Sequence, residues 1–155
     1  MRDNPGFVDL YNSDFAIVFR AVFALFGDRA LAEDCAQEAF AKALERWHRI
    51  GLEPWVGGWV MKTAINEARR SRKLRGVFHL RPSQTEEDFE AALDLRMALS
   101  TLSPRQQEAT VLHYLGDFPL EQVASIMDCE VGTVKAHLWR ARRILAKRME
   151  ADKSV

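Results

Sequence analysis

Basic side chains gather in two short stretches of this 155-residue chain, whose formal net charge is zero. Residues 61–75 carry six basic groups and one acidic group, and residues 129–155 carry seven basic and three acidic groups. The remaining stretches, 1–60 and 76–128, are net acidic. Clustered lysine and arginine side chains are the groups that neutralise nucleic-acid phosphates. The charge distribution therefore indicates two candidate surfaces for contact with phosphate groups.

The C-terminal basic stretch belongs to a predicted helix-turn-helix at residues 120–143. Two helices joined by a three-residue turn at 128–130, the second of them basic, are typical of modules that place the second helix in the major groove. Ala124 is small where the helices must cross, and Gly132 leaves backbone N–H groups open to a phosphate. The alternative is a helical hairpin with a solvated basic face, but turn length, crossing residue and charge all favour DNA binding. The residues expected on the DNA-facing side of the second helix are Thr133, Lys135, Ala136, His137, Trp139, Arg140, Arg142 and Arg143.

Three helices are predicted in the first half of the chain from its apolar periodicity. The first spans 5–26, and Asp28 is placed to cap the next one. The second spans 29–48, with an apolar stripe that includes Leu44. The third spans about 59–75; its start is apolar and aromatic, and its end is basic. The polar face of the second helix comprises Glu33, Asp34, Gln37, Glu38, Lys42 and Glu45.

A change in pattern divides the chain after the third helix. Residues 76–88 contain Gly, Pro, Ser and an acidic run, which predicts an interdomain linker. Further on, Ser103-Pro104-Arg105-Gln106 has the pattern of a capping box at a helix start, and that helix ends at Gly116. Gly and Pro are sparse and most polar residues are good helix formers. We therefore expect an all-α fold of two small helical domains, 1–75 and 89–155, joined by a flexible linker.

Several classes of function are disfavoured by what the sequence lacks. It has no phosphate-binding glycine loop and no metal-ligand motif, and its four histidines are scattered. We therefore expect neither enzymatic activity nor a cofactor nor a metal. Cys35 and Cys129 lie far apart and fit buried small hydrophobes in a reducing compartment. No signal peptide or membrane-spanning stretch is visible, which favours a cytoplasmic protein without membrane insertion.

The stretch PLEQVASIMDCEVGTVKAHLWRARRIL resembles region 4 of the extracytoplasmic-function (ECF) sigma factors, the part that binds the −35 promoter element. The Gly132-Thr133-Val134-Lys135 and Arg140-Ala141-Arg142 clusters carry much of the resemblance. It implies that the DNA-facing residues named above bind −35 DNA. The sequence departs from the family pattern at Pro119, Ala136 and His137, which bears on the promoter sequence rather than on the class of function.

The second predicted helix extends the resemblance. Ala32-Glu33-Asp34-Cys35-Ala36-Gln37-Glu38-Ala39-Phe40 is similar to the region 2 helix that docks on the clamp helices of RNA polymerase. Asp34, Gln37 and Glu38 match its polar positions, and their i, i+3, i+4 spacing places them on one helix face. The alternative is an ordinary solvated face. The resemblance implies that these three residues bind the polymerase core.

The third predicted helix looks like the −10 recognition helix of the same family. A base captured from a melted strand needs a pocket and hydrogen-bonding groups, and the strand needs cations for its phosphates. Asn66 can read a base edge, and the loop at 50–58 could shape a pocket. We expect Trp59 to pack in the core, whereas Trp55 fits either core packing or base contact. The residues that the resemblance assigns to −10 DNA are Asn66, Arg69, Arg70 and Lys73.

The resemblance covers about residues 7–149 and implies one function. An ECF sigma factor joins core RNA polymerase, melts the −10 element with its first domain and binds the −35 element with its second. Its expected partners are the polymerase core, promoter DNA and an anti-sigma factor. A helix-turn-helix regulator that never joins the polymerase is the alternative. Such a regulator would need neither the face formed by Asp34, Gln37 and Glu38 nor the helix at 66–75.

Overall fold

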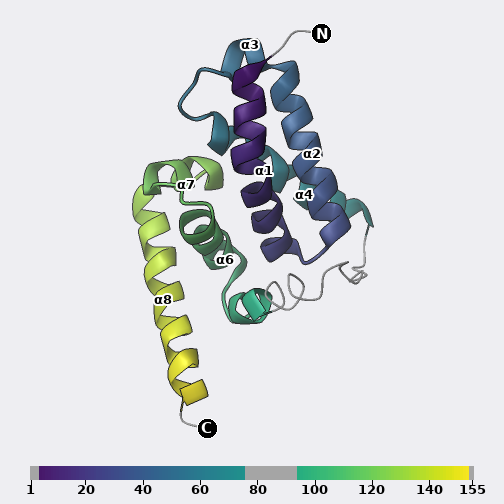
Figure 1. Ribbon diagram of the computed structural model, residues 1–155. Helices are drawn as coiled ribbons and strands as arrows, with labels where there is room; N and C mark the ends of the chain where they lie inside the picture. Colours follow the sequence, from purple (N-terminus) through teal and green to yellow (C-terminus); the bar gives the residue numbers. More distant parts are fainter. Residues whose placement is uncertain (1–3, 76–93, 154–155) are drawn as a thin grey trace. The chain divides into compact units, whose positions relative to one another are not determined.

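The computed structural model describes residues 4–75 and 94–153 (Figure 1). Within these residues the regular secondary structure is entirely helical, so the prediction of an all-α fold is confirmed. The chain divides into two compact units, residues 1–82 and 83–155. The linker expected at 76–88 lies outside the described residues, and so does residue 89, where we expected the second domain to begin.

The first unit contains α1 (Pro5–Phe26), α2 (Arg29–Glu45), the short α3 (Trp47–Ile50) and α4 (Val56–Arg75). Helices α1, α2 and α4 pack against one another in pairs; Figure 1 shows α1 and α2 side by side, with α4 behind them. The bounds of α1 agree with the prediction. The second helix is shorter than predicted, because the chain breaks after α2 and resumes as α3, and α4 begins three residues earlier than expected.

The predicted break between α1 and α2 is confirmed. Gly27 has φ 74° and donates its N–H to the Phe23 carbonyl at 2.8 Å, which ends α1. The Asp28 carboxylate accepts the Leu31 N–H at 3.0 Å, which caps α2. Such a cap typically contributes about 1 kcal/mol. Glycine is suited to this position because the left-handed conformation costs it no steric strain.

Small side chains build the core of the first unit. On α2, Ala32, Ala36, Ala39 and Ala43 are fully buried. Short side chains let α2 lie close to both α1 and α4. Leu44, expected in the apolar stripe, is instead 45% exposed. The prediction was wrong here because Leu44 lies about 100° around the helix from the fully buried Ala43, on the flank of the stripe.

The second unit contains α6 (Pro104–Thr110), a π-helical turn (Val111–Leu115), α7 (Leu120–Met127) and α8 (Val131–Lys153); residues 94–99 are also helical. Both α6 and α7 pack against α8. The core that α7 and α8 share is built from four buried side chains, Val123, Met127, Val134 and Leu138, and Leu145 beside it is half-buried.

The start of α6 has the capping box that the sequence predicted. Ser103 Oγ accepts the Gln106 N–H at 3.3 Å, and the Gln106 side chain accepts the Ser103 N–H at 3.0 Å. The helix ends at Gly116 as expected, but Gly116 is not left-handed; Asp117 is, with φ 58°. Glycine is favoured at 116 for space, because an added Cβ would lie 2.8 Å from the Leu112 carbonyl oxygen and from the Phe118 ring.

Candidate nucleic-acid interface

Helices α7 and α8 form the predicted helix-turn-helix. Asp128 ends α7 in the left-handed conformation, with φ 53°, a conformation that aspartate tolerates better than most residues. The Cys129 N–H then bonds to the Ala124 carbonyl at 3.0 Å, which closes the turn. Ala124 itself is 5% exposed, as expected for a residue where two helices lie close together. The turn therefore fixes the direction in which α8 leaves α7.

One face of α8 is buried and the opposite face is open. Val134, Leu138 and Ala141 are buried against the rest of the second unit. Two predicted DNA-facing residues, Ala136 and His137, are half-buried. The others are exposed, and they are Thr133, Lys135, Trp139, Arg140, Arg142 and Arg143. A basic surface thus covers the solvent side of α8.

Two neighbouring arginines of α8 have different surroundings. The Arg142 guanidinium donates a hydrogen bond to the Tyr114 hydroxyl at 3.0 Å. The Arg143 guanidinium lies over the Trp139 ring, 4.7 Å from its centroid. Arg142 is therefore tied to the π-helical turn, whereas Arg143 rests on an aromatic side chain of its own helix.

His137 sits at the edge of the α8 surface. Burial lowers the pKa of its imidazole below 6.5, and the positive charges of Arg105 and Arg140 act in the same direction. Its Nδ1 is buried and has no hydrogen-bond partner among the described residues. The lowered pKa therefore reduces the positive charge that His137 adds to this surface near pH 7.

The face predicted on α2 is exposed as a unit. Asp34, Gln37 and Glu38 are all open to solvent, while Cys35 and Ala36 beside them are buried. The helix thus presents two carboxylates and an amide on the side away from its own core. Such a face suits a partner surface that carries cations and hydrogen-bond donors.

Helix α4 exposes Asn66, Arg69 and Arg70. Ile65, directly before Asn66, and Ala68, directly before Arg69, are buried in the first unit. The side chain of Lys73 lies outside what the structure describes. Asn66 therefore occupies an open position directly before the basic end of the helix.

The two tryptophans near the start of α4 differ in exposure. Trp59 is half-buried, with the Arg46 guanidinium 5.8 Å from its ring centroid. Trp55 is 44% exposed. Trp59 therefore packs in the core only in part. Trp55, for which core packing and base contact were both open, lies at the surface.

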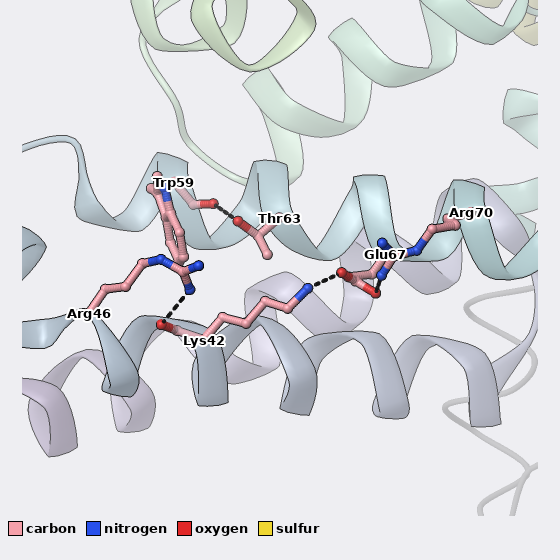
Figure 2. A network of polar contacts seen from close by, with 6 residues as sticks. All are labelled: Lys42, Arg46, Trp59, Thr63, Glu67 and Arg70. Atoms are coloured by element: carbon pink, nitrogen blue, oxygen red, sulfur yellow. Dashed lines mark hydrogen bonds and ion pairs between the residues drawn. The ribbon is translucent and has the colours of Figure 1, made fainter.

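A network of polar contacts joins α2 to α4 (Figure 2). The Glu67 carboxylate, 13% exposed, pairs with Lys42 of α2 and with Arg70 of α4, the latter at 2.5 Å. The Lys42 hydrogen bond lowers the pKa of the Glu67 carboxyl below its ordinary value of 4.5, and Arg70 acts in the same direction. Lys42, expected on the outer polar face of α2, is instead directed toward α4. Arg70 is thus engaged inside the first unit.

Comparison with known proteins assigns both units. The Sigma-70 region 2 family matches residues 10–74, and the Sigma-70 region 4 family matches residues 92–145. The ECF RNA polymerase sigma factor SigL of Mycobacterium tuberculosis is 31% identical over 150 residues, covering 88% of this chain and 84% of SigL. The chain belongs to the ECF sigma factor family. It therefore acts with RNA polymerase in promoter-specific initiation of transcription.

Other relatives of this sigma factor agree. The RNA polymerase sigma factor SigV of Bacillus subtilis is 28% identical over 136 residues, covering 82% of this chain and 81% of SigV. The sigma factor RpoE in complex with the anti-sigma factor NepR, from Bartonella quintana, has a TM-score of 0.75 at 24% identity over 94% of this chain and 98% of RpoE. CnrH in complex with the cytosolic domain of CnrY also has a TM-score of 0.75, at 17% identity over 94% of this chain and 88% of that one. These two structures share the fold.

Sigma factors regulate transcription and are not enzymes. Within 4–75 and 94–153, no group of three or more His, Cys, Asp or Glu side chains is arranged to hold a metal ion. None of the helices described there is long and apolar enough to cross a membrane. Cys35 is buried as expected, whereas Cys129 is only half-buried in the turn of the helix-turn-helix.

Two polar contacts of this sigma factor are not predicted by its sequence. The first is the Lys42–Glu67 pair, which joins residues 25 positions apart and has no local signal; only the Glu67–Arg70 contact follows from i, i+3 spacing. The second is Arg105 of α6, which donates to the Met127 carbonyl at 2.6 Å and pairs with Glu108 at 3.3 Å. Arg105 thereby holds the end of α7 and supports the turn that leads into α8.

Proposed function

We propose that this sigma factor divides promoter recognition among three exposed helix faces. The acidic and amide face of α2 binds core polymerase, α4 binds the melted −10 strand, and α8 binds the −35 duplex. The observation that carries the proposal is the contrast in charge between the exposed faces: two carboxylates on α2 against an open row of cations on α8. Each face lies opposite a buried one, so the fold leaves it available for a partner.

Binding of the −35 element rests on the first half of α8. An α-helix fits the major groove, and side chains near its start reach the base edges. Thr133, Lys135 and Arg140 are exposed there. Arginine or lysine contacts to a base edge contribute about 1–3 kcal/mol of discrimination. The pKa of His137 is lowered, so this residue contributes more by hydrogen bonding than by charge.

Binding of the −10 element rests on α4. Asn66 offers both donor and acceptor groups to a base that has left the stack, and Arg69 and Lys73 would meet the phosphates of the strand. Arg70 has a second task, because Glu67 neutralises it. We therefore assign Arg70 to holding the polar network and give it a smaller share of phosphate binding.

Regulation by an anti-sigma factor is part of the proposal. The RpoE structure that shares this fold was solved in complex with the anti-sigma factor NepR. A partner of this kind would cover exposed faces that the polymerase or DNA otherwise uses. We also propose that the functional modules are 1–75 and 89–155, that the chain has no catalytic activity of its own, and that it works in the cytoplasm, where polymerase and promoter DNA meet.

Reconstitution with core RNA polymerase tests the proposed function. The chain should co-purify with the core, and the resulting holoenzyme should start transcription at discrete promoters mapped by sequencing of the transcripts. A control reaction contains core polymerase alone. If the chain binds duplex promoter DNA without the core and never forms a holoenzyme, the alternative of a polymerase-independent helix-turn-helix regulator is correct instead.

A further inference from the structure

A shallow hollow lies beside the exposed face of α8, where that helix meets the start of α6. Its volume is about 220 Å³. It contains three cationic side chains, an amide, an aromatic ring and an aliphatic side chain, and no carboxylate. The lining residues are Gln106, Trp139, Arg140, Arg143, Ile144 and Lys147.

The polar groups of this hollow are available for a ligand. Among the described residues, no carboxylate is paired with Arg140, Arg143 or Lys147. The Gln106 side-chain oxygen accepts the Ser103 N–H, so its amide NH₂ is the group it can offer. The Arg143 guanidinium is held over Trp139, and a guanidinium stacked on a ring keeps its N–H edge free to donate. The hollow is therefore complementary to an anion.

The length of α8 indicates which anion the hollow would meet when the helix lies on DNA. The helix has 23 residues and is about 34 Å long, whereas the major groove is only about 12 Å wide. With the first half of α8 in the groove, its later turns must lie over the groove wall, which is the phosphate backbone. Arg143 and Lys147 come three and four turns after the start of α8, so they lie at this distance.

We propose that the hollow binds a backbone phosphate flanking the −35 element, with Arg143, Lys147 and the Gln106 amide as donors. Trp139 is a positioning residue in this site, because its ring holds the Arg143 guanidinium. Arg140 lies between the hollow and the base-reading half of the helix. Such a contact fixes the register of α8 on the duplex and carries no sequence information of its own. The proposal rests on the proposed −35 binding by α8.

Salt-dependent binding of the holoenzyme to two duplexes tests the site. One duplex is a mapped promoter fragment, and the other is the same fragment with its −35 element scrambled. Lys147→Gln should reduce the slope of log affinity against log salt concentration by about one for both duplexes. Between 50 and 200 mM salt, the variant should therefore lose roughly three- to fourfold less affinity than the unmodified protein.

Lys153→Gln is the matched control. It removes the same charge from the exposed end of the same helix, away from the hollow, and should leave the slope unchanged. Gln106→Glu is a second variant that keeps the helix cap, since glutamate also serves in a capping box. This variant should bind both duplexes more weakly than the unmodified protein, because a carboxylate would face the phosphate.

Three outcomes would overturn the phosphate site. The first is an unchanged salt slope in Lys147→Gln; the second is a change equal to that of Lys153→Gln; the third is a loss confined to the promoter duplex, which indicates base reading. Failure of the proposed function looks different. In that case the unmodified holoenzyme does not distinguish the two duplexes, although the salt slopes can still be measured.

The positioning role of Trp139 has its own test. Trp139→Ala and Arg143→Gln should each reduce the salt slope, and the double variant should be no weaker than Arg143→Gln alone. Trp139→Phe should retain most of the binding, because phenylalanine also offers a ring face to a guanidinium. Additive losses in the double variant would show that Trp139 acts independently of Arg143, which contradicts the assignment.

Discussion

Helices α4 and α8 both end in basic stretches, yet they present their cations in different ways. On α4, Arg70 is paired with Glu67, which also pairs with Lys42 of α2. On α8, Arg140, Arg143 and Lys147 form no ion pair with the described residues. The net charge of a stretch therefore does not reveal how many of its cations can meet a phosphate.

The difference follows from packing. Helix α4 lies against both α1 and α2, so a polar side chain at its edge can reach a neighbouring helix. Helix α8 buries a single stripe, and most of its circumference faces solvent. In the proposed division of roles, α8 reads duplex DNA with a broad open surface, whereas α4 captures the melted strand and also packs in the core of its own unit.

The largest expected effects separate the two helices by the step at which they act. Arg140→Ala should weaken binding to a −35 duplex by about 1–3 kcal/mol, or roughly 5- to 150-fold. Asn66→Ala should leave that binding nearly unchanged and impair strand opening. A duplex-binding assay with the holoenzyme and permanganate footprinting of the same promoter report the two steps. If Asn66→Ala opens the promoter strands normally, the assignment of strand opening to α4 and duplex binding to α8 is wrong.

A second prediction concerns carboxylates that lie outside the Glu67 network. Asp34→Ala combined with Glu38→Ala should lower the affinity for core polymerase by about tenfold, since each exposed charge pair contributes up to about 1 kcal/mol. Stability should change by less than about 0.5 kcal/mol because both side chains are exposed. Pull-down of core polymerase and thermal denaturation measure the two quantities. Glu33→Ala, another exposed carboxylate of α2, tests whether the effect is specific to the predicted face.

Glu67→Gln should release Arg70 from its ion pair, so that α4, like α8, presents an unpaired arginine. The loss of a charged hydrogen-bonded pair at a partly buried site should cost about 1 kcal/mol of stability at pH 7. The pKa of Glu67 is lowered by folding, so its contribution is present above its unfolded value of 4.5 and is lost as the pH falls through the lower folded value. Denaturation at pH 7 and below pH 4.5 should show the variant losing less stability on acidification. An identical pH response would contradict this account of the network.

The smallest expected effect concerns His137 on α8. Burial lowers the pKa of its imidazole, so below pH 6.5 the unfolded chain takes up a proton more readily than the folded one. The second unit should therefore lose stability as the pH falls from 6.5 toward the lower folded pKa. His137→Gln should remove that part of the pH dependence, which thermal denaturation at pH 7.5 and 5.5 would detect. If His137→Gln and the unmodified protein show the same dependence of stability on pH, this account of His137 is wrong.

Much of the local structure was predictable from the sequence. The caps at Asp28 and Ser103 and the turn at 128–130 depend on side chains within a few residues of the backbone groups they satisfy. The shared face of Asp34, Gln37 and Glu38 also follows from helical spacing alone, and the structure exposes all three.

The sequence by itself thus determined the helices, the helix starts that carry a side-chain cap and most of the faces they could present, because these depend on interactions over one or two helical turns. Only the tertiary structure decided which polar groups remain available. Lys42 meets Glu67 across 25 positions and Arg142 meets Tyr114 across 28, and neither pairing has a local signal. The hollow beside Gln106 and Lys147 likewise exists only because α6 packs against α8. Such contacts depend on how helices pack and on side-chain rotamers, which the spacing of residues along one helix does not specify.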